Sequence, residues 1–395
     1  MDIIILADFC GPLDGTSNSR FLYLADMLAK DNSVEIITSD FNHGTKKYFQ
    51  HEIEKHDYLV TMLHERSYPA NVCLQRFVGH FIWGCSVRKY LKNRKKPDVI
   101  YCAIPPLTAP YLTAKYCEKN GVRFVIDVQD LWPEAFKMVF NISLLSKIVF
   151  APFQFLADGI YKRADAICAV SKTYAERALR VNKKCTKAHV VYLGTELETF
   201  DRNAEQNPVI KPTEEIWVGY CGTLGASYDI GIVLDALASL KKCNVKQPKF
   251  IILGDGERRK EFESYAREKE INCLFTGRLP YDQMCGWLIA CDMVVNPIMH
   301  NAAQSIINKH ADYAASGLPV LNTQESQEYR DLVDEYQMGF NCKNGDPADL
   351  AEKLRTLIEE KELRQRMGRN ARKCAEEKFD RRKTYQVIID RIVEQ

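Results

Sequence analysis

Short apolar runs alternate with longer segments of helical periodicity along most of the chain. The helical segments include residues 19–30 and 108–119. This alternation predicts βαβ units, and therefore a parallel sheet covered by helices on both faces. The strands predicted in the first half span residues 2–7, 34–38, 58–63, 98–103, 123–128, 166–170 and 189–193.

A polar stretch at residues 201–213, with Pro208 and Pro212, has the composition of a linker. We therefore expect an α/β protein of two Rossmann-like doubly wound domains, residues 1–206 and 207–379, facing each other across a cleft. A last helix, about 380–395, is expected to pack back on the first domain. The strands predicted in the second half span residues 216–221, 249–253, 272–275, 292–296 and 319–322.

Composition narrows the class of protein. The chain has 395 residues and a net charge of +2, without a basic aromatic stripe or a zinc-ligand spacing, which argues against nucleic-acid binding. Its fourteen cysteines form no C-x-x-C pair, which indicates reduced thiols in the cytoplasm. The apolar N-terminal run lacks the basic start of a signal peptide, and no apolar run is long enough to span a membrane.

Glycine turns follow three predicted strands of the second half, at Gly222, Gly254 and Gly277. The carboxyl ends of parallel strands share one edge, so these turns are expected to meet there. Backbone amides in such turns bind phosphate groups. In the first half, a glycine-containing loop at residues 8–17 also follows a strand, but it lacks G-x-G-x-x-G and hence the dinucleotide fingerprint.

Residues 304–320 predict a short helix followed by a strand. Lys309, Asp312, Tyr313 and Ser316 share one helical face, because their spacing is i, i+3, i+4, i+7. That face offers a cation for phosphates and a carboxylate for ribose hydroxyls. The alternative is a surface ion pair on a capped helix, worth roughly 0.2–0.5 kcal/mol.

The ordered set of motifs resembles family-4 glycosyltransferases with the GT-B fold. Residues 127–134, Asp-Val-Gln-Asp-Leu-Trp-Pro-Glu, are similar to the form found in the bacterial surface-polysaccharide members of that family. The resemblance covers nearly the whole chain. The other matching segments are 164–171, 190–195, 220–225, 253–256, 275–279, 290–297 and 309–320.

The resemblance implies retaining transfer of a sugar, without a cofactor or a metal, from a nucleotide-sugar to a lipid-linked or glycan acceptor in capsule, O-antigen or exopolysaccharide synthesis. A UDP-sugar is favoured, with a hexose or an N-acetylhexosamine. Lys309 and Asp130 are expected to be catalytic, and Arg20, Asp130 and Trp132 to bind the acceptor. The expected donor-binding residues are Gly15, Gly222, Thr223, Leu224, Gly254, Arg278, Leu279, Gln304, Ser305, Ile306, Asn308 and Asp312.

Three positions depart from the commoner family pattern. Gln304 stands where a glutamate is usual, and Thr223 and Tyr228 replace an arginine and a lysine that would face the phosphates. A diphosphate in a closed site needs positive partners. Lys309 is the best remaining cation, and Arg20 and Arg258 are weaker candidates.

Residues 74–96 hold seven basic side chains and no acidic ones, with aromatic residues between them. The apolar stretch 138–156 has Lys147 as its one charge. Both features favour peripheral contact with the anionic inner face of the cell membrane. The alternative is a core-facing helix with a solvated basic end.

Two other functions remain open from the residues alone. A GT-B nucleotide-sugar epimerase would need clustered acid and base groups, and a sugar-nucleotide-binding protein without transfer activity would fit the Gln304 departure. An assay for transfer or donor hydrolysis separates these classes. Asp127 is expected to be structural, and the histidines at 43, 51, 56, 64 and 310 are expected to lie on the surface.

Overall fold

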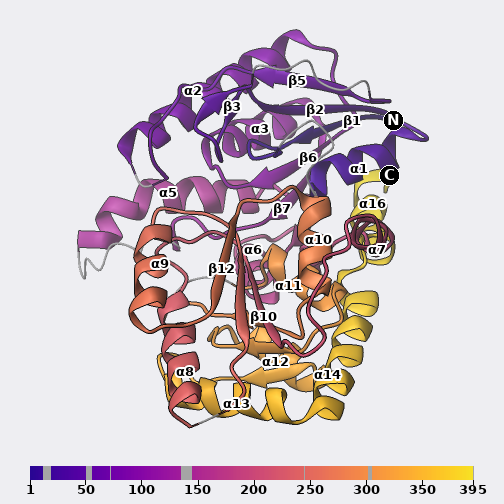
Figure 1. The fold of residues 1–395 in the computed structure, drawn as a ribbon. Helices are drawn as coiled ribbons and strands as arrows, with labels where there is room; N and C mark the ends of the chain where they lie inside the picture. The colour runs from indigo at the N-terminus through magenta and orange to yellow at the C-terminus, as the bar shows by residue number, and fades with distance from the viewer. Residues whose placement is uncertain are drawn as a thin grey trace. The chain divides into compact units, whose positions relative to one another are not determined.

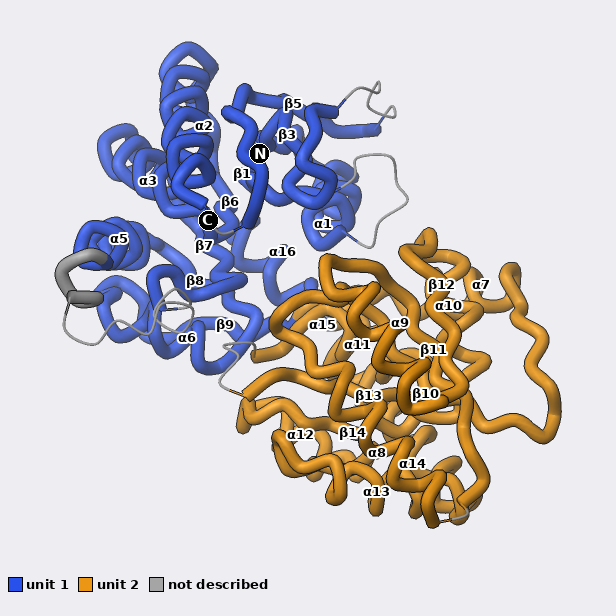
Figure 2. The backbone as a smooth tube through the Cα atoms, turned by 60° about the vertical axis from the view of Figure 1, so that its left-hand side comes forward, with its two compact units in different colours: residues 1–192, 384–395 blue, residues 193–383 orange. Residues whose placement is uncertain are grey.

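The computed structural model describes residues 1–11, 19–49, 56–71, 73–134, 145–243, 245–300 and 305–394. The chain divides into two compact units (Figure 2). Unit 1 comprises Met1–Tyr192 and Thr384–Gln395, and unit 2 comprises Leu193–Lys383. Each unit has its own parallel sheet and its own hydrophobic core.

The described sheet of unit 1 has seven parallel strands in the order β5-β2-β1-β6-β7-β8-β9 (Figure 1). The chain begins in the middle of the sheet, runs to one edge and then crosses to the other side, so the order reverses between β1 and β6. Ligands of doubly wound sheets bind at such a reversal. The strands are β1 (Asp2–Leu6), β2 (Ser33–Ser39), β5 (Leu59–Leu63), β6 (Val99–Ile104), β7 (Arg123–Val128), β8 (Ala166–Ala169) and β9 (His189–Val190).

Helices cover both faces of this sheet, because side chains alternate along each strand and both faces are apolar. Ile3 and Ile5 share a buried cluster with residues of α1 (Arg20–Ala29) and α16 (Gln386–Val393). Elsewhere in the unit, α3 packs on β6 and β7 and contacts both α2 and α5. The bounds are α2 (Leu74–Asn93), α3 (Thr108–Asn120), α5 (Leu145–Tyr161) and α6 (Lys172–Leu179).

The described sheet of unit 2 has the parallel order β12-β11-β10-β13-β14-β15, with its reversal between β10 and β13. Fully buried residues of the strands, such as Tyr220 and Phe250, pack with Leu234 of α8 and Leu354 of α13. The strands are β10 (Trp217–Cys221), β11 (Lys249–Leu253), β12 (Cys273–Gly277), β13 (Met293–Asn296), β14 (Val320–Asn322) and β15 (Gly339–Asn341).

The helices of unit 2 connect these strands and close its C-terminal end (Figure 1). Asp229 caps α8 by accepting from the Ile232 amide, and Asp346 caps α13 with Pro347 at the first helical position. Up to residue 374, the α-helices of unit 2 are α7 (Leu197–Gln206), α8 (Ile230–Lys242), α9 (Arg259–Glu268), α10 (Tyr281–Ile289), α11 (Asn308–Ala315), α12 (Gln327–Tyr336), α13 (Pro347–Glu359) and α14 (Lys361–Cys374).

The stretch predicted as a linker is partly helical, because α7 extends to Gln206 and packs against α10. The contact is close: a Cβ on Gly286 would lie 1.8 Å from the Asn207 carbonyl oxygen. Asp201 also accepts two hydrogen bonds from Arg372, at 2.7 and 2.6 Å. These contacts tie α7 to unit 2, so the boundary between the units falls at Leu193, before the position near 207 that the composition suggested.

The chain returns to unit 1 at its C-terminal end. Residues 375–379 form a π-helical turn, and the Thr195 amide donates to the Phe379 carbonyl oxygen at 2.9 Å. Tyr385, Ile388 and Ile392 then lie fully buried in the core of unit 1. The core of unit 1 therefore needs both ends of the described chain.

The predicted strands are all present, with small shifts at their ends. The prediction from the sequence missed the hairpin of β3 (Phe41–Asn42) and β4 (Lys47–Tyr48), and it also missed the edge strand β15. These strands have two or three residues and no apolar run, so periodicity could not detect them.

Helix α2 carries apolar and basic residues on the same exposed face, in separate parts of its length. Leu74, Val78 and Phe81 are exposed on one face, at 82%, 43% and 59%, and basic residues follow on the same face nearer the C-terminus of the helix. Two of the seven basic residues in segment 74–96 point into the protein and not toward a membrane surface. Arg76 stacks on Trp132, and Arg94 binds Glu35 and Asp2. Among the described helices, none is both long enough and apolar enough to cross a bilayer.

Candidate functional site

Three glycine turns meet at one edge of the unit 2 sheet, as expected from the strand order. Gly222 follows β10 with φ of +144°, and its amide donates to the Leu253 carbonyl oxygen at 3.0 Å. Gly254 and Gly277 form an isolated bridge beside it. A Cβ on Gly254 would lie 1.8 Å from the Gly222 carbonyl oxygen, so the packing of the turns requires glycine there.

The predicted contacts around these turns differ in accessibility. Thr223 and Arg278 are exposed and Leu279 is half-buried, so all three are accessible to a ligand. Leu224 is fully buried, its amide donates to the Asp255 carbonyl oxygen, and its own carbonyl oxygen accepts from the Arg258 amide. Leu224 therefore holds the turn in place rather than facing a ligand, which corrects its assignment as a donor contact.

Helix α11 turns its polar face toward the end of β10, as its spacing predicted. The Tyr313 hydroxyl accepts a hydrogen bond from the Cys221 amide at 2.8 Å. The Lys309 side chain lies beside Gly222, since a Cβ on that glycine would be 2.7 Å from Lys309 Nζ. The absence of a side chain at position 222 therefore leaves room for the lysine directly beside the glycine turn.

Lys309 is buried in an aromatic cage. Its Nζ lies 4.2 Å from the ring centre of Tyr220 and 4.0 Å from that of Tyr228, and it has no hydrogen-bond partner among the described residues. Burial lowers the pKa of Lys309 from 10.5 to about 7, while Cys221 opposes this change. The site thus holds an amine without a hydrogen-bond partner among the described residues, and a bound anion would stabilise its protonated form.

Asp312 is held one turn farther along the same face. It accepts a hydrogen bond from the Tyr281 hydroxyl at 2.9 Å, and that hydroxyl lies 2.7 Å from the Thr195 hydroxyl. Burial raises the pKa of Asp312 to about 6, although these hydrogen bonds and Arg381 oppose the rise. The carboxyl group is therefore ionised at neutral pH and positioned to accept further hydroxyl donors.

The segment before α11 is more buried than the sequence suggested. Ser305 and Ile306 are 7% and 2% exposed, and Ser305 Oγ donates to Glu328 at 3.3 Å, so these two side chains support the helix start. Asn308 is exposed. Two predicted donor contacts, Gly15 and Gln304, lie outside the described residues.

His310 is not on the surface, which corrects the prediction for this residue. It is fully buried and stacks on Tyr329, with ring centres 3.5 Å apart and an interplanar angle of 3°. Its Nε2 lies 3.1 Å from Asn296 Nδ2, and its Nδ1 accepts from the Ile307 amide at 3.3 Å. Burial lowers the pKa of His310, so the ring is neutral and anchors the first turn of α11.

In unit 1, Asp130 and Trp132 lie together after β7. Asp130 accepts from the Leu131 amide at 2.8 Å and from Trp132 Nε1 at 3.3 Å. Burial raises the pKa of Asp130. Trp132 is 4% exposed, so its side chain orients Asp130 and offers little surface to a ligand.

Arg20 is committed to the interior of unit 1. Its guanidinium contacts Asp127 at 2.9 and 3.0 Å, donates to the Val191 and Tyr192 carbonyl oxygens, and lies over the Tyr385 ring. Asp127 is fully buried and structural, as predicted. Arg20 is therefore a structural residue and not an acceptor contact or a phosphate cation. Arg258, the other weak candidate, pairs with Glu261 at 2.6 Å.

Sequence reasoning missed a second cluster in unit 1, formed by Asp8, Glu65 and His80. Asp8 and Glu65 follow β1 and β5 closely, which is where polar residues of doubly wound sheets face ligands. That position was a usable sign for the two acids. His80 lies in a helix that was interpreted as membrane-facing, with a core-facing helix as the alternative, and nothing in its spacing relates it to the acids.

Comparison with known proteins agrees with this geometry. Residues 18–199 match the family described as Glycosyltransferase Family 4, and residues 201–374 match Glycosyl transferases group 1. The chain is 25% identical to the probable glycosyltransferase WbjE of Pseudomonas aeruginosa over 284 residues, 69% of this chain and 68% of that protein. It is 24% identical to the uncharacterized glycosyltransferase MJ1178 of Methanocaldococcus jannaschii, over 53% of this chain and 54% of that one.

Solved structures show the same fold over the whole chain. HepE of Anabaena in complex with UDP has a TM-score of 0.72 at 18% identity, with 100% of both chains covered. WaaG, a glycosyltransferase involved in lipopolysaccharide biosynthesis, has a TM-score of 0.70 at 15% identity, also with 100% of both chains covered. With a family match over each unit and this shared architecture, the chain belongs to the family-4 glycosyltransferases of the GT-B fold.

Proposed function

We propose that this glycosyltransferase takes a UDP-sugar and transfers its hexose or N-acetylhexosamine, with retention of configuration, to a lipid-linked or glycan acceptor in surface-polysaccharide synthesis. The observation that carries the donor assignment is the unpaired, buried Lys309 beside Gly222. An amine without an anion in a closed site is costly, and a diphosphate is the anion that a glycine turn at a strand end accommodates.

The proposed donor contacts follow the polar face of α11. The diphosphate rests on Gly222 and Thr223 and pairs with Lys309, and the ribose hydroxyls donate to Asp312. Arg278 and Leu279 contact the base through their backbone. HepE was solved in complex with UDP and with UDP-glucose, which supports a uridine nucleotide here.

Transfer then needs stabilisation of the negative charge that develops on the leaving diphosphate. Lys309 and the Thr223 amide supply it without a metal ion at the phosphates, because the Gly222 and Leu224 amides donate to carbonyl oxygens of the chain. In this proposal an oxygen of the leaving phosphate takes the proton of the acceptor hydroxyl. Asp130 orients that hydroxyl, and no strong protein base is needed.

A ligand screen tests the donor assignment. UDP should raise the midpoint of thermal unfolding more than GDP or ADP, since binding stabilises by about 2.7 kcal/mol at a hundredfold excess over Kd. A panel of UDP-sugars should then give transfer to a lipid-linked acceptor, and NMR of the product should show the anomeric configuration of the donor. A larger thermal shift with GDP or ADP would contradict the uridine assignment.

We also propose that unit 1 binds the anionic inner face of the membrane through α2. Its exposed Leu74, Val78 and Phe81 can enter the interface, and its basic end can meet anionic headgroups. A groove of about 670 Å³ beside it supports this proposal, because lysines and arginines dominate its lining. The basic residues of the groove are Arg88, Lys92, Arg94, Lys96, Lys115 and Lys119.

Co-sedimentation with vesicles tests the membrane assignment. Binding should require anionic lipid and weaken with added salt, because the electrostatic part is screened. Equal sedimentation with neutral and anionic vesicles, or none with either, would contradict it.

A further inference from the structure

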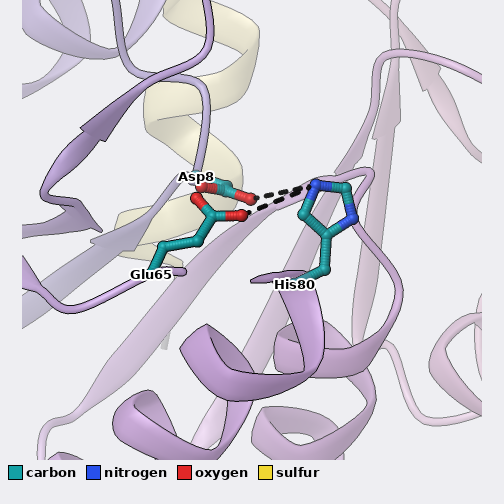
Figure 3. A group of neighbouring side chains, drawn as sticks. All are labelled: Asp8, Glu65 and His80. Carbon is teal, nitrogen blue, oxygen red and sulfur yellow. Dashed lines mark ion pairs between the residues drawn. The ribbon is translucent and has the colours of Figure 1, made fainter. Parts of the chain in front are cut away.

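Asp8, Glu65 and His80 approach one another inside unit 1 (Figure 3). His80 Nε2 lies 3.9 Å from an Asp8 carboxylate oxygen and 3.8 Å from a Glu65 carboxylate oxygen. The three residues are 5%, 1% and 3% exposed. They come from three separate elements, since Asp8 follows β1, Glu65 follows β5 and His80 belongs to α2.

The atoms that face one another in this cluster have no hydrogen-bond partner in the described part of the chain. They are both carboxylate oxygens of Asp8, Oε1 of Glu65 and Nε2 of His80. An unpaired buried polar group costs roughly 1–3 kcal/mol, and a charged group costs more. Each of the three side chains directs one such atom at the same place, which indicates a missing partner that they would share.

The rest of the cluster is firmly held. The other Glu65 oxygen accepts from Ser39 Oγ at 2.7 Å, and the Glu65 amide donates to Asp40 at 2.9 Å. The His80 ring packs 5.6 Å from the Trp132 ring and 5.8 Å from Phe9. The unpaired atoms of Glu65 and His80 thus belong to side chains held by a hydrogen bond or by ring packing, and such support orients the ligands of a bound ion.

We propose that Asp8, Glu65 and His80 bind one divalent transition-metal ion, with Zn²⁺ the best fit. Two carboxylates and a neutral imidazole match the charge of such an ion, and three protein ligands leave one position for water. Ligand atoms of a tetrahedral zinc site lie about 3.4 Å apart, so contraction of the cluster by about half an ångström completes the site. Imidazole favours a transition metal over Mg²⁺ or Ca²⁺.

A shared proton is the simplest competing partner. Burial raises the pKa of both Asp8 and Glu65. Charge repulsion from Glu65, and the hydrogen bond that a proton on Asp8 would make to Glu65, add to the rise of the Asp8 pKa, and the nearby guanidinium of Arg76 opposes the rise of both. A proton between the two carboxyl groups would satisfy only that pair, because His80 Nε2 is too far from either for a hydrogen bond. A metal ion satisfies all three side chains at once. A sugar hydroxyl is disfavoured, since the four atoms have almost no accessible surface.

The ion would join the end of β1, the loop after β5 and α2. It would also fix the His80 ring beside Trp132, whose Nε1 donates to Asp130. Its role is to hold these elements of unit 1 in place, and it takes no part in the transfer step. The inference is independent of the donor proposed for unit 2.

Co²⁺ is a suitable probe, because the fourteen cysteines could bind zinc nonspecifically and sulfur ligation has its own absorption. The full-length protein, stripped with a chelator and kept reduced, should bind one equivalent of Co²⁺ with a d–d spectrum and no sulfur-to-cobalt charge-transfer band. Zn²⁺ should displace the Co²⁺ and raise the midpoint of thermal unfolding. Metal analysis of protein purified without chelator should give about one ion per chain.

The matched variants are Glu65→Gln and Glu325→Gln. Both remove a carboxylate beside a histidine, but the Glu325–His300 pair at 3.0 Å is exposed and in unit 2. Glu65→Gln should weaken Co²⁺ binding by about a hundredfold or more, and Glu325→Gln should leave it unchanged. Asp8→Asn serves as the second variant if Glu65→Gln does not fold.

Two results would overturn the proposal. One is the absence of a Co²⁺ spectrum from nitrogen and oxygen ligands in the folded wild-type protein. The other is binding that both Glu65→Gln and Asp8→Asn leave intact. If the wild-type protein binds no metal, and the Asp8→Asn variant is more stable than the chelated wild type, the cluster is instead a proton-sharing pair.

Discussion

Replacing Lys309 by methionine should stabilise the free protein and weaken its binding of UDP. At 1.36 kcal/mol per pKa unit, lowering the pKa of this lysine from 10.5 to about 7 corresponds to about 5 kcal/mol against the charged form. The cation–π interactions with the two tyrosine rings offset this cost by about 0.5–2 kcal/mol each. The net cost of burying the charge is then about 1–4 kcal/mol, and methionine of similar shape avoids it.

The stability gained by Lys309→Met should depend on pH, because the pKa of Lys309 differs between the folded and unfolded states. The folded pKa lies below the unfolded one, so the cost is full below pH 7 and disappears as the pH rises toward 10.5. The gain from Lys309→Met should therefore be largest near pH 7 and smaller by pH 9. Calorimetric unfolding of both proteins at the two pH values measures it, with the exposed Lys260→Met as the control.

Binding of UDP should change in the opposite direction. The diphosphate provides the missing partner, so the wild-type lysine should take up a proton on binding, and affinity should fall as the pH rises above 7. Loss of a charged hydrogen bond costs about 1.5–3 kcal/mol, which predicts roughly 10- to 150-fold weaker binding for Lys309→Met. Titration calorimetry in buffers of different ionisation enthalpy detects the proton. A Lys309→Met protein that is less stable at pH 7 yet binds UDP normally would refute the reasoning.

Three further predictions concern other residues. Asp312→Asn should weaken UDP binding about tenfold or more, and the loss of wild-type affinity as the pH falls through about 6 should be absent from this variant, as measured by calorimetric titration. Phe81→Ser should reduce sedimentation with anionic vesicles, whereas Ile210→Ser, at a 95% exposed position in unit 2, should not. Asp127→Ala should cost about 3–5 kcal/mol in urea unfolding, because it leaves the Arg20 charge buried and unpaired; a loss below 1 kcal/mol would contradict that pairing.

Periodicity was enough to predict every strand of the two large described sheets except the edge strand β15. The central strands, such as β1, β6 and β10, are apolar and buried on both faces, so their sequence pattern is strong even without knowledge of their partners. The failures occur where a residue's environment is set by distant parts of the chain. Residues 201–206 have a polar composition but pack on α10, and His310 looks like a surface residue until Asn296 and Tyr329 are brought beside it.

The candidate site shows the same division. Lys309 and Asp312 lie on one helix, so their common face follows from spacing alone. Arg20 was misassigned because its partner Asp127 comes from another strand. Asp8, Glu65 and His80 share no local motif, and only the strand order β5-β2-β1 and the packing of α2 bring them together.

The return of the chain to unit 1 has a consequence for biosynthesis. Tyr385, Ile388 and Ile392 complete the core around β1 and α1, which precede unit 2 in the chain. Unit 2 is one continuous segment and can fold as soon as residue 383 has left the ribosome. Unit 1 begins before unit 2 but is completed only by the last helix, so part of its apolar core surface stays exposed while unit 2 is translated.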